Sequence, residues 1–363
     1  MKDQCSLKSF CDPGIANSCG NRPIIDPLAP KISVTTWKVN YLTSDVAGST
    51  PNFDPIMSNP WGIVIFDNEI FIANGATDAI TNYDLFGVKI IGRISVRSAV
   101  HNSSFPTDII VNCGNSFNIS NGITERSPRF LTCTEQGTVH AYSPQINPNQ
   151  SSVVLNMQLT GEVSSYTGIA VANNVLYLAN FFQGHIDVFA GDYERLFGYN
   201  FVDGDSSDPI PIDYSPFNIV HIGPFLYVLW ARRNPNVVFK ELDGPGLGFV
   251  SVFGLDGSFI RRFTSRGVLN APWAMIPAPC ECGFPPGSFL IGNNGDGRIN
   301  IFDANGGFVG PLLNQAGLPI SIEGLRGLSP LYAEFNQIYF TAAPFEESGG
   351  VLGNIVKSQV ASF

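Results

Sequence analysis

The sequence contains few charged residues and is not dominated by the residues that build helical proteins. Only 14% of its 363 residues are charged, and 20 Lys and Arg face 30 Asp and Glu, which gives a formal net charge of −10. Strong acidity without a basic stripe argues against nucleic acid as the main ligand. Because Ala, Glu, Lys and Leu do not dominate the composition, the sequence also argues against a coiled coil or a helical bundle.

Long apolar segments are missing as well. No run approaches 18 apolar residues, so the sequence predicts no transmembrane segment. The first eight residues, MKDQCSLK, lack the apolar centre of a secretory signal peptide. Hydrophobic residues nevertheless make up 44% of the chain, with 28 Phe, alongside 37 Gly and 26 Pro. Such a chain can bury a large core, which excludes a disordered protein.

One pattern repeats six times along the chain. Each unit has a first hydrophobic segment, usually led by Pro or Thr, then a second one, and a Gly-containing turn before a third, as in Gly297-Arg298-Ile299-Asn300-Ile301. Alternating apolar and polar residues are typical of a strand. Four short strands per unit, with units about 46 to 61 residues apart, indicate a β-propeller. The blades are predicted to begin near residues 59, 106, 167, 216, 272 and 325.

The two ends of the repeat region complete each other. The last unit ends after its third strand, near Val356, whereas residues 32–42 form a strand without a blade of its own. As the outer strand of the last blade, this segment would close the ring and protect an open edge. The sequence therefore predicts an all-β fold, a six-bladed β-propeller of four-stranded blades over residues 31–358, closed by an N-terminal strand. Residues 1–30 are predicted to be a separate tail that contains Cys, Pro and Gly.

Several of these motifs resemble one known family. Asn59-Pro60-Trp61-Gly62 and the segment from Gly295 to Asp303, GDGRINIFD, are similar to those of a family of mostly bacterial, secreted six-bladed propellers. The resemblance covers roughly residues 36–355, and more distantly the repeat is similar to NHL-repeat and gluconolactonase-like propellers. It implies the propeller fold but no established activity. This chain departs from the family in its Cys-containing tail and in the absence of the usual signal peptide.

Ligand sites of propellers usually lie where the inner strands begin, around the central channel. Oxygen-bearing residues at these positions could hold Ca²⁺, which takes 6–8 oxygen ligands. Similar propeller lactonases use such a metal. The alternative is that these side chains make turn hydrogen bonds. The residues concerned are Asn59, Asp108, Thr167, Asn218, Asn270 and Glu323.

A second group of charged residues lies between the third and fourth units. Asp203, Asp205 and Asp208 form an acidic loop that faintly suggests a calcium site, although the EF-hand pattern is not met. A solvated acidic loop is the alternative. Arg232 and Arg233, in the long loop of the fourth unit, are candidates for binding an anionic ligand or for pairing with the acidic loop.

The seven cysteines suggest a disulfide and an attachment device. Cys113 and Cys133 are predicted to face each other on neighbouring strands and to form a bridge. Cys5, Cys11 and Cys19 in the tail are candidates for cross-links to other chains, which would require an oxidising location. Free thiols and a plain disordered terminus are the alternatives.

No catalytic motif is recognisable. The four His residues are scattered over different strands and loops, and neither G-x-S-x-G nor H-E-x-x-H occurs. Two functions therefore remain open. The first is a non-catalytic structural or binding propeller, assembled through its tail with itself or with protein partners on the outside of a cell, spore or virion. The second is a calcium-dependent, lactonase-like hydrolase with its site at the channel mouth.

Overall fold

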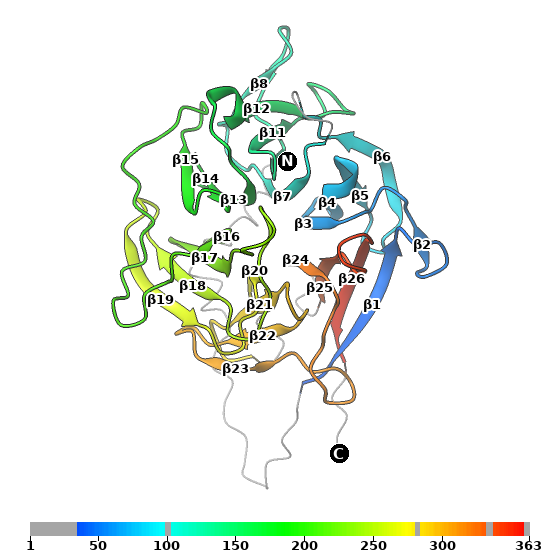
Figure 1. Cartoon of the computed structure of the whole chain (residues 1–363). Coiled ribbons are helices and arrows are strands. Elements are labelled where there is room, and N and C mark those ends of the chain that lie inside the picture. Colours follow the sequence, from blue (N-terminus) through cyan, green and yellow to red (C-terminus); the bar gives the residue numbers. More distant parts are fainter. Residues whose placement is uncertain (1–34, 99–102, 280–283, 332–336, 359–363) are drawn as a thin grey trace.

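The repeat units fold into small antiparallel sheets that stand around a central axis, as Figure 1 shows. The structure is a computed structural model that describes residues 35–98, 103–279, 284–331 and 337–358. Within these residues the helical elements are two short 3-10 turns, Gly75–Thr77 and Met157–Thr160. None of the described helices is long and apolar enough to span a membrane. The predicted tail, with Cys5, Cys11 and Cys19, lies outside the described residues.

Each blade runs from an inner strand at the axis to an outer strand at the rim. Blades one and two comprise β3 (Pro60–Phe66), β4 (Glu69–Asn74), β5 (Ala79–Tyr83) and β6 (Lys89–Ser95), then β7 (Pro106–Val111), β10 (Phe130–Thr134), β11 (Thr138–Tyr142) and β12 (Ser152–Asn156). A small hairpin of β8 (Ile119–Ser120) and β9 (Glu125–Arg126) projects from the connection between β7 and β10. Blades three and four comprise β13 (Tyr166–Ala172), β14 (Val175–Asn180) and β15 (His185–Phe189), then β16 (Tyr214–Ile222), β17 (Phe225–Arg232), β18 (Phe249–Phe253) and β19 (Phe259–Ser265).

The remaining two blades follow the same plan. Blade five contains β20 (Pro272–Pro277), β21 (Phe289–Asn293), β22 (Ile299–Phe302) and β23 (Phe308–Pro311). Blade six contains β24 (Leu325–Pro330), β25 (Gln337–Ala342) and β26 (Val351–Lys357) from the end of the chain, with β1 (Trp37–Ser44) and β2 (Asn52–Phe53) from its beginning. The predicted six-bladed, all-β fold is thus confirmed.

The ring closes where the two ends of the chain meet in blade six. Strand β1 pairs antiparallel with β26, from Trp37 opposite Lys357 to Ser44 opposite Val351. This is the predicted clasp. The Trp37 ring also stacks on Phe284 at 5.7 Å, and the Trp37 backbone N–H donates to the Leu313 carbonyl at 2.8 Å, so the clasp holds blade five as well.

Blade three differs from the others at its rim. Its sheet has three strands, and the outer position is taken by an irregular segment that touches β15 through an isolated bridge between Phe189 and Arg195. The segment continues to Asp203, whose carboxylate binds Arg262 of β19 in a nearly buried ion pair at 2.7 Å. The chain here crosses to the next blade instead of completing its own.

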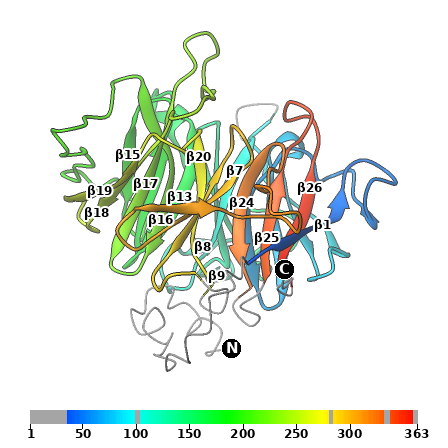
Figure 2. The same cartoon turned by 90° about the horizontal axis from the view of Figure 1, so that it is seen from below.

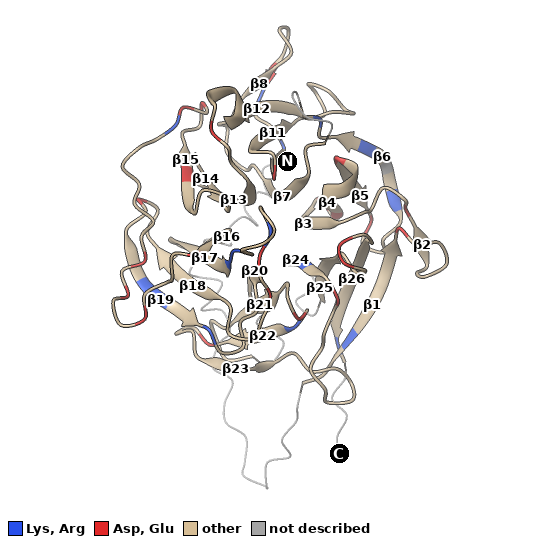
Figure 3. Ribbon diagram, in the orientation of Figure 1, with Lys and Arg blue, Asp and Glu red and all other residues tan. Residues whose placement is uncertain are grey.

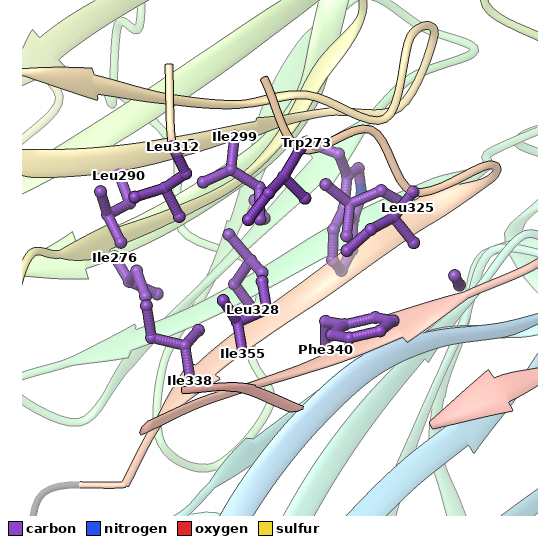
Figure 4. Packing of buried hydrophobic residues seen from close by; sticks show 14 of the residues in the cluster. Trp273, Ile276, Leu290, Ile299, Leu312, Leu325, Leu328, Ile338, Phe340 and Ile355 are labelled. Carbon is purple, nitrogen blue, oxygen red and sulfur yellow. The ribbon is translucent and has the colours of Figure 1, made fainter. Parts of the chain in front are cut away.

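The hydrophobic core lies between the faces of neighbouring blades. Figure 4 shows Ile276, Leu290 and Leu312 of blade five packed toward Leu328 and Ile338 of blade six. All but a few per cent of these side chains is removed from solvent. Burying one such side chain stabilises the fold by about 1.5–3 kcal/mol, so each blade depends on its neighbours.

Candidate functional site

All inner strands begin at the same end of the ring, which we call the top face. Because strands within a blade are antiparallel, the loop between the second and third strands of each blade also lies there, as the pairing of Pro60 with Asn74 and of Pro272 with Asn293 demonstrates. The longest of these loops follows β17 and stands out from the ring in Figure 2. The top face is therefore where loops of different blades meet.

Every inner strand carries a register irregularity near its beginning, and the residue at this point is equivalent in all six blades. These residues are Trp61, Thr107, Thr167, Phe217, Trp273 and Arg326. The Trp61 ring of blade one contacts Phe217 of blade four at 6.1 Å and Trp273 of blade five at 5.7 Å, both edge to face. Contacts across the ring mean that these three side chains, which we call the aromatic plug, fill the channel.

The indole N–H groups of the plug are satisfied within the ring. Nε1 of Trp273 donates to the Thr167 carbonyl at 2.9 Å, and Nε1 of Trp61 donates to Oδ1 of Asn59 at 3.0 Å. The rings themselves are almost fully buried. A plug with no free polar group is a rigid apolar floor under the top face.

Arg326 lies directly on this floor. Its guanidinium carbon is 4.3 Å from the centre of the Trp61 ring, and the side chain is 1% exposed. Nη2 donates to Oε1 of Glu347 at 2.7 Å, whereas Nε and Nη1 have no hydrogen-bond partner in the protein. Buried donors without a partner are rare, so these N–H groups mark a place where a water or a ligand atom is expected.

Charged residues from three blades surround Arg326. We call Arg326, Lys240, Glu135, Glu241, Asp243 and Glu347 the mouth cluster. Glu135 comes from the loop after β10, residues 240–243 from the loop after β17, and Glu347 from the loop after β25. Nζ of Lys240 lies 3.4 Å from Oε1 of Glu347. In Figure 3 the charged residues of these loops gather around the middle of the ring.

The pKa values of three of the four carboxyl groups in the mouth cluster are raised, and that of the fourth, Glu347, is lowered. Burial raises the pKa of Glu135 to about 7, and the nearby Glu241 and Glu347 add to this shift. Burial likewise raises the pKa values of Glu241 and Asp243, against the opposing effect of Arg326. Burial also opposes ionisation of Glu347, but Arg326 and Lys240 outweigh it and hold the pKa of Glu347 below its ordinary value. Glu135 is therefore the member of the cluster that can exchange a proton near neutral pH.

The predicted channel residues support the site instead of forming it. Asn59 accepts the Trp61 indole N–H, as described above. Oδ1 of Asn270 accepts from the Gly244 backbone N–H at 2.7 Å, and Oε1 of Glu323 accepts from the Phe345 N–H at 2.9 Å. These are the turn hydrogen bonds that the sequence left as an alternative, and the last two brace the loops that carry Asp243 and Glu347.

Asp108 and Asn218 directly follow Thr107 and Phe217, the residues at the register irregularity, and they join neighbouring blades. The Asp108 carboxylate accepts from the backbone N–H groups of Ile109 at 2.8 Å and of Ile169, in blade three, at 3.2 Å. Asn218 accepts from the Ile219 N–H at 2.7 Å and donates to the carbonyl of Trp273, in blade five, at 2.8 Å. Burial raises the pKa of Asp108 to about 7.

Two of the three carboxylates of the acidic loop, for which calcium was one alternative, are bound by arginines of blade four. Asp203 accepts from Nη2 and Nε of Arg262 at 2.7 and 3.0 Å, and Asp208 accepts from Arg266 at 2.8 Å. Asp205 accepts from the Ser207 backbone N–H at 3.0 Å. The carboxylates are thus bound by protein donors, and nowhere in the described part of the chain do three His, Cys, Asp or Glu side chains form a metal-binding group.

The predicted disulfide is wrong, since Cys113 and Cys133 are both free. Cys133 pairs with Asp108, whereas Val111 pairs with Phe130, so Cys113 lies beyond the other end of the strand pair. A separation of five strand residues corresponds to about 17 Å, well beyond the reach of a bridge.

The remaining two predicted residues belong to one pocket. Nε of Arg232 lies 2.6 Å from Oδ2 of Asp213, the pairing that the sequence left as an alternative. Nη2 of Arg233 donates to the Ile212 carbonyl at 2.8 Å. Both side chains line a pocket next to the mouth cluster.

Sequence reasoning missed the six members of the mouth cluster. One signal was available, because Leu325-Arg326 occupies the repeat position of Pro60-Trp61 and Pro272-Trp273, which places an arginine at the channel. No comparable signal marks the carboxylates, since their loops differ in length and sequence.

Six sheets around a plugged axis define the protein as a six-bladed β-propeller. The chain is 58% identical over 362 residues to uncharacterized protein L690 of Acanthamoeba polyphaga mimivirus, covering 100% of this chain and 97% of that protein. It is 57% identical over 362 residues to uncharacterized protein R648 of the same virus, covering 100% of this chain and 90% of that protein. The chain therefore belongs to the family of L690 and R648. No family model matches the sequence.

Solved structures agree on the fold alone. A Bacteroides thetaiotaomicron protein of unknown function aligns with a TM-score of 0.58 and 11% identity over 90% of this chain and 77% of its own. A putative phosphatase from the same organism gives a TM-score of 0.58 and 10% identity over 90% and 79%. The expected resemblance to a mostly bacterial secreted family remains a prediction.

Proposed function

We propose that this protein is a non-catalytic binding propeller, displayed on an outer surface through its Cys-containing tail. The aromatic plug carries the proposal, because it closes the channel in which a lactonase-like metal was expected. Above the plug, a buried arginine with free N–H groups and several carboxyl groups offer donors and acceptors for a ligand. Such an arrangement supports recognition, and it contains no metal group among the described residues.

The display function rests on the sequence of the tail. Cys5, Cys11 and Cys19 lie in a segment with too few large apolar groups to form a core, so cross-links to other chains are geometrically unconstrained. The relatives L690 and R648 are viral proteins, which favours the virion among the possible surfaces. Tail cysteines can link chains only in an oxidising final location.

Non-reducing electrophoresis of protein from its native source tests this function. We expect species of higher mass that disappear on reduction and in a variant with Cys5, Cys11 and Cys19 changed to Ser. A Cys113→Ser variant, which changes a free cysteine of the propeller, should keep them. A reduced monomer in the native material would refute the attachment.

Metal analysis of the purified protein tests the non-catalytic part. We expect no stoichiometric calcium and no calcium-dependent hydrolysis of lactones. One tightly bound calcium ion per chain, together with such hydrolysis, would establish the alternative enzyme instead.

A further inference from the structure

We propose that the pocket beneath the loop after β17 binds a small organic anion with an apolar body. The inference rests on the proposed binding function and names the class of its ligand. The pocket has a volume of about 330 Å³, within the range of small-molecule sites. It lies between blades three and four and is lined by Phe181 and Phe182 of blade three and by residues of blade four and its long loop.

The charge of the pocket is opposite to that of the whole chain. Three of its lining residues, Arg232, Arg233 and Lys240, are cations, and Asp213 is its single carboxylate. Arg232 is bound to Asp213, and Lys240 to Glu347 of the mouth cluster. Arg233 has a backbone carbonyl as its partner and no ion pair with the described carboxylates. In a chain of net charge −10, this local excess of positive charge favours an anion at Arg233.

The remaining walls of the pocket are apolar and partly exposed. The Phe239 ring packs on Phe182 at 4.9 Å, which joins the loop of blade four to blade three. Val237, Val238 and Phe239 are 48%, 66% and 43% exposed. An apolar ligand body would cover these side chains and remove their surface from water.

The backbone of the loop presents these residues in a fixed arrangement. Oδ1 of Asn234 accepts from the backbone N–H groups of Asn236 and Val237 at 2.9 and 3.2 Å, and the Asn234 N–H donates to the Lys240 carbonyl at 2.8 Å. Phe239 has a φ of 68°, a left-handed conformation that is unfavourable for a bulky side chain. Strain of this kind is typical of binding loops, where it persists because the surrounding contacts hold it.

Isothermal titration calorimetry of the full-length protein with 2-naphthoate tests the proposal. This probe combines a carboxylate with an aromatic body, whereas acetate and 2-naphthalenemethanol each lack one of the two. We expect saturable binding of 2-naphthoate and about tenfold weaker or undetectable binding of the other two, since each loses one group of contacts. Equal binding of 2-naphthoate and 2-naphthalenemethanol, or no saturation with 2-naphthoate, would overturn the proposal.

Variants locate the binding in the pocket. Arg233→Gln and Phe239→Ala should each weaken 2-naphthoate binding by about tenfold, and Arg233→Lys, which keeps the charge, should lie between Arg233→Gln and the wild type. Arg126→Gln changes an exposed arginine of the β8–β9 hairpin and should leave binding unchanged. Thermal unfolding of each variant verifies that it folds. Undiminished binding by folded Arg233→Gln and Phe239→Ala would overturn this assignment, whatever the tail and the metal analysis reveal about the proposed function.

Discussion

Asp108 offers the sharpest test of how the inner strands hold the ring together. Its carboxyl group is buried next to the plug and bridges blades two and three, and burial raises its pKa from 3.8 to about 7. The folded protein binds this proton more tightly than the unfolded protein does. The free energy of unfolding therefore falls as the pH rises from about 4 to 7. A shift of this size corresponds to about 4 kcal/mol.

Replacement of Asp108 by Asn should remove this pH dependence. The amide carries no charge to desolvate, but its single acceptor oxygen can serve only one of the two N–H groups, Ile109 or Ile169. Leaving the other N–H unsatisfied costs about 1–3 kcal/mol at every pH. We therefore expect Asp108→Asn to be less stable than the wild type at pH 5 and equally or more stable at pH 8.

Urea unfolding of both proteins at pH 5 and pH 8 measures the effect. The difference between variant and wild type isolates Asp108, because the other titrating groups are common to both proteins. Asn218→Asp is the matched control at the equivalent position of blade four. It replaces a donor to the Trp273 carbonyl with a carboxyl group and should destabilise more at pH 8 than at pH 5. An equal difference at both pH values for Asp108→Asn would refute the argument.

Three further predictions concern closure, charge and packing. Deleting residues 1–45 should abolish cooperative thermal unfolding, measured by circular dichroism, because it removes β1, whereas deleting residues 1–28 should preserve it. Arg326→Leu should lower the free energy of unfolding in urea by about 1.5–3 kcal/mol at pH 8, since it removes the hydrogen bond to Glu347 and the positive charge that favours ionised Glu135 and Glu241, and by less at pH 5, where the carboxyl groups with raised pKa values gain protons. Gly168→Ala should lower it by about 1–3 kcal/mol because the new Cβ would collide with Asn218, whereas Gly92→Ala, with open space around it, should not.

The architecture could be predicted because its signals are local. The repeated inner-strand starts, the alternation in third strands such as Ile299-Asn300-Ile301, and the unpartnered strand ending at Leu42 specify six blades and their closure. Six such blades form a propeller because each sheet buries its hydrophobic faces against the neighbouring sheets. The rim of blade three escaped prediction, since its outer segment is held by Arg262 of the next blade.

The errors have a common cause in contacts between distant residues. Cys113 and Cys133 were placed opposite each other on neighbouring strands, but Cys113 lies two residues past the end of β7, whereas Cys133 is the fourth residue of β10 and pairs near the start of β7. Asp203 and Asp208 are bound by arginines about 60 residues away, which no spacing within the loop reveals. Register and cross-blade pairing decide both cases, and neither is encoded by local sequence.

The fold separates stability from recognition along the axis of the ring. Asp108 and Asn218 join blades below the plug, and the plug closes the channel to a ligand that approaches from the top face. There, one long loop after β17 supplies Arg233 to the pocket, Glu241 to the mouth cluster and Lys240 to both. Because residues 233–240 of this loop lie outside the strands of blade four, a change in their sequence can alter the ligand while the strand pairing of the ring is kept.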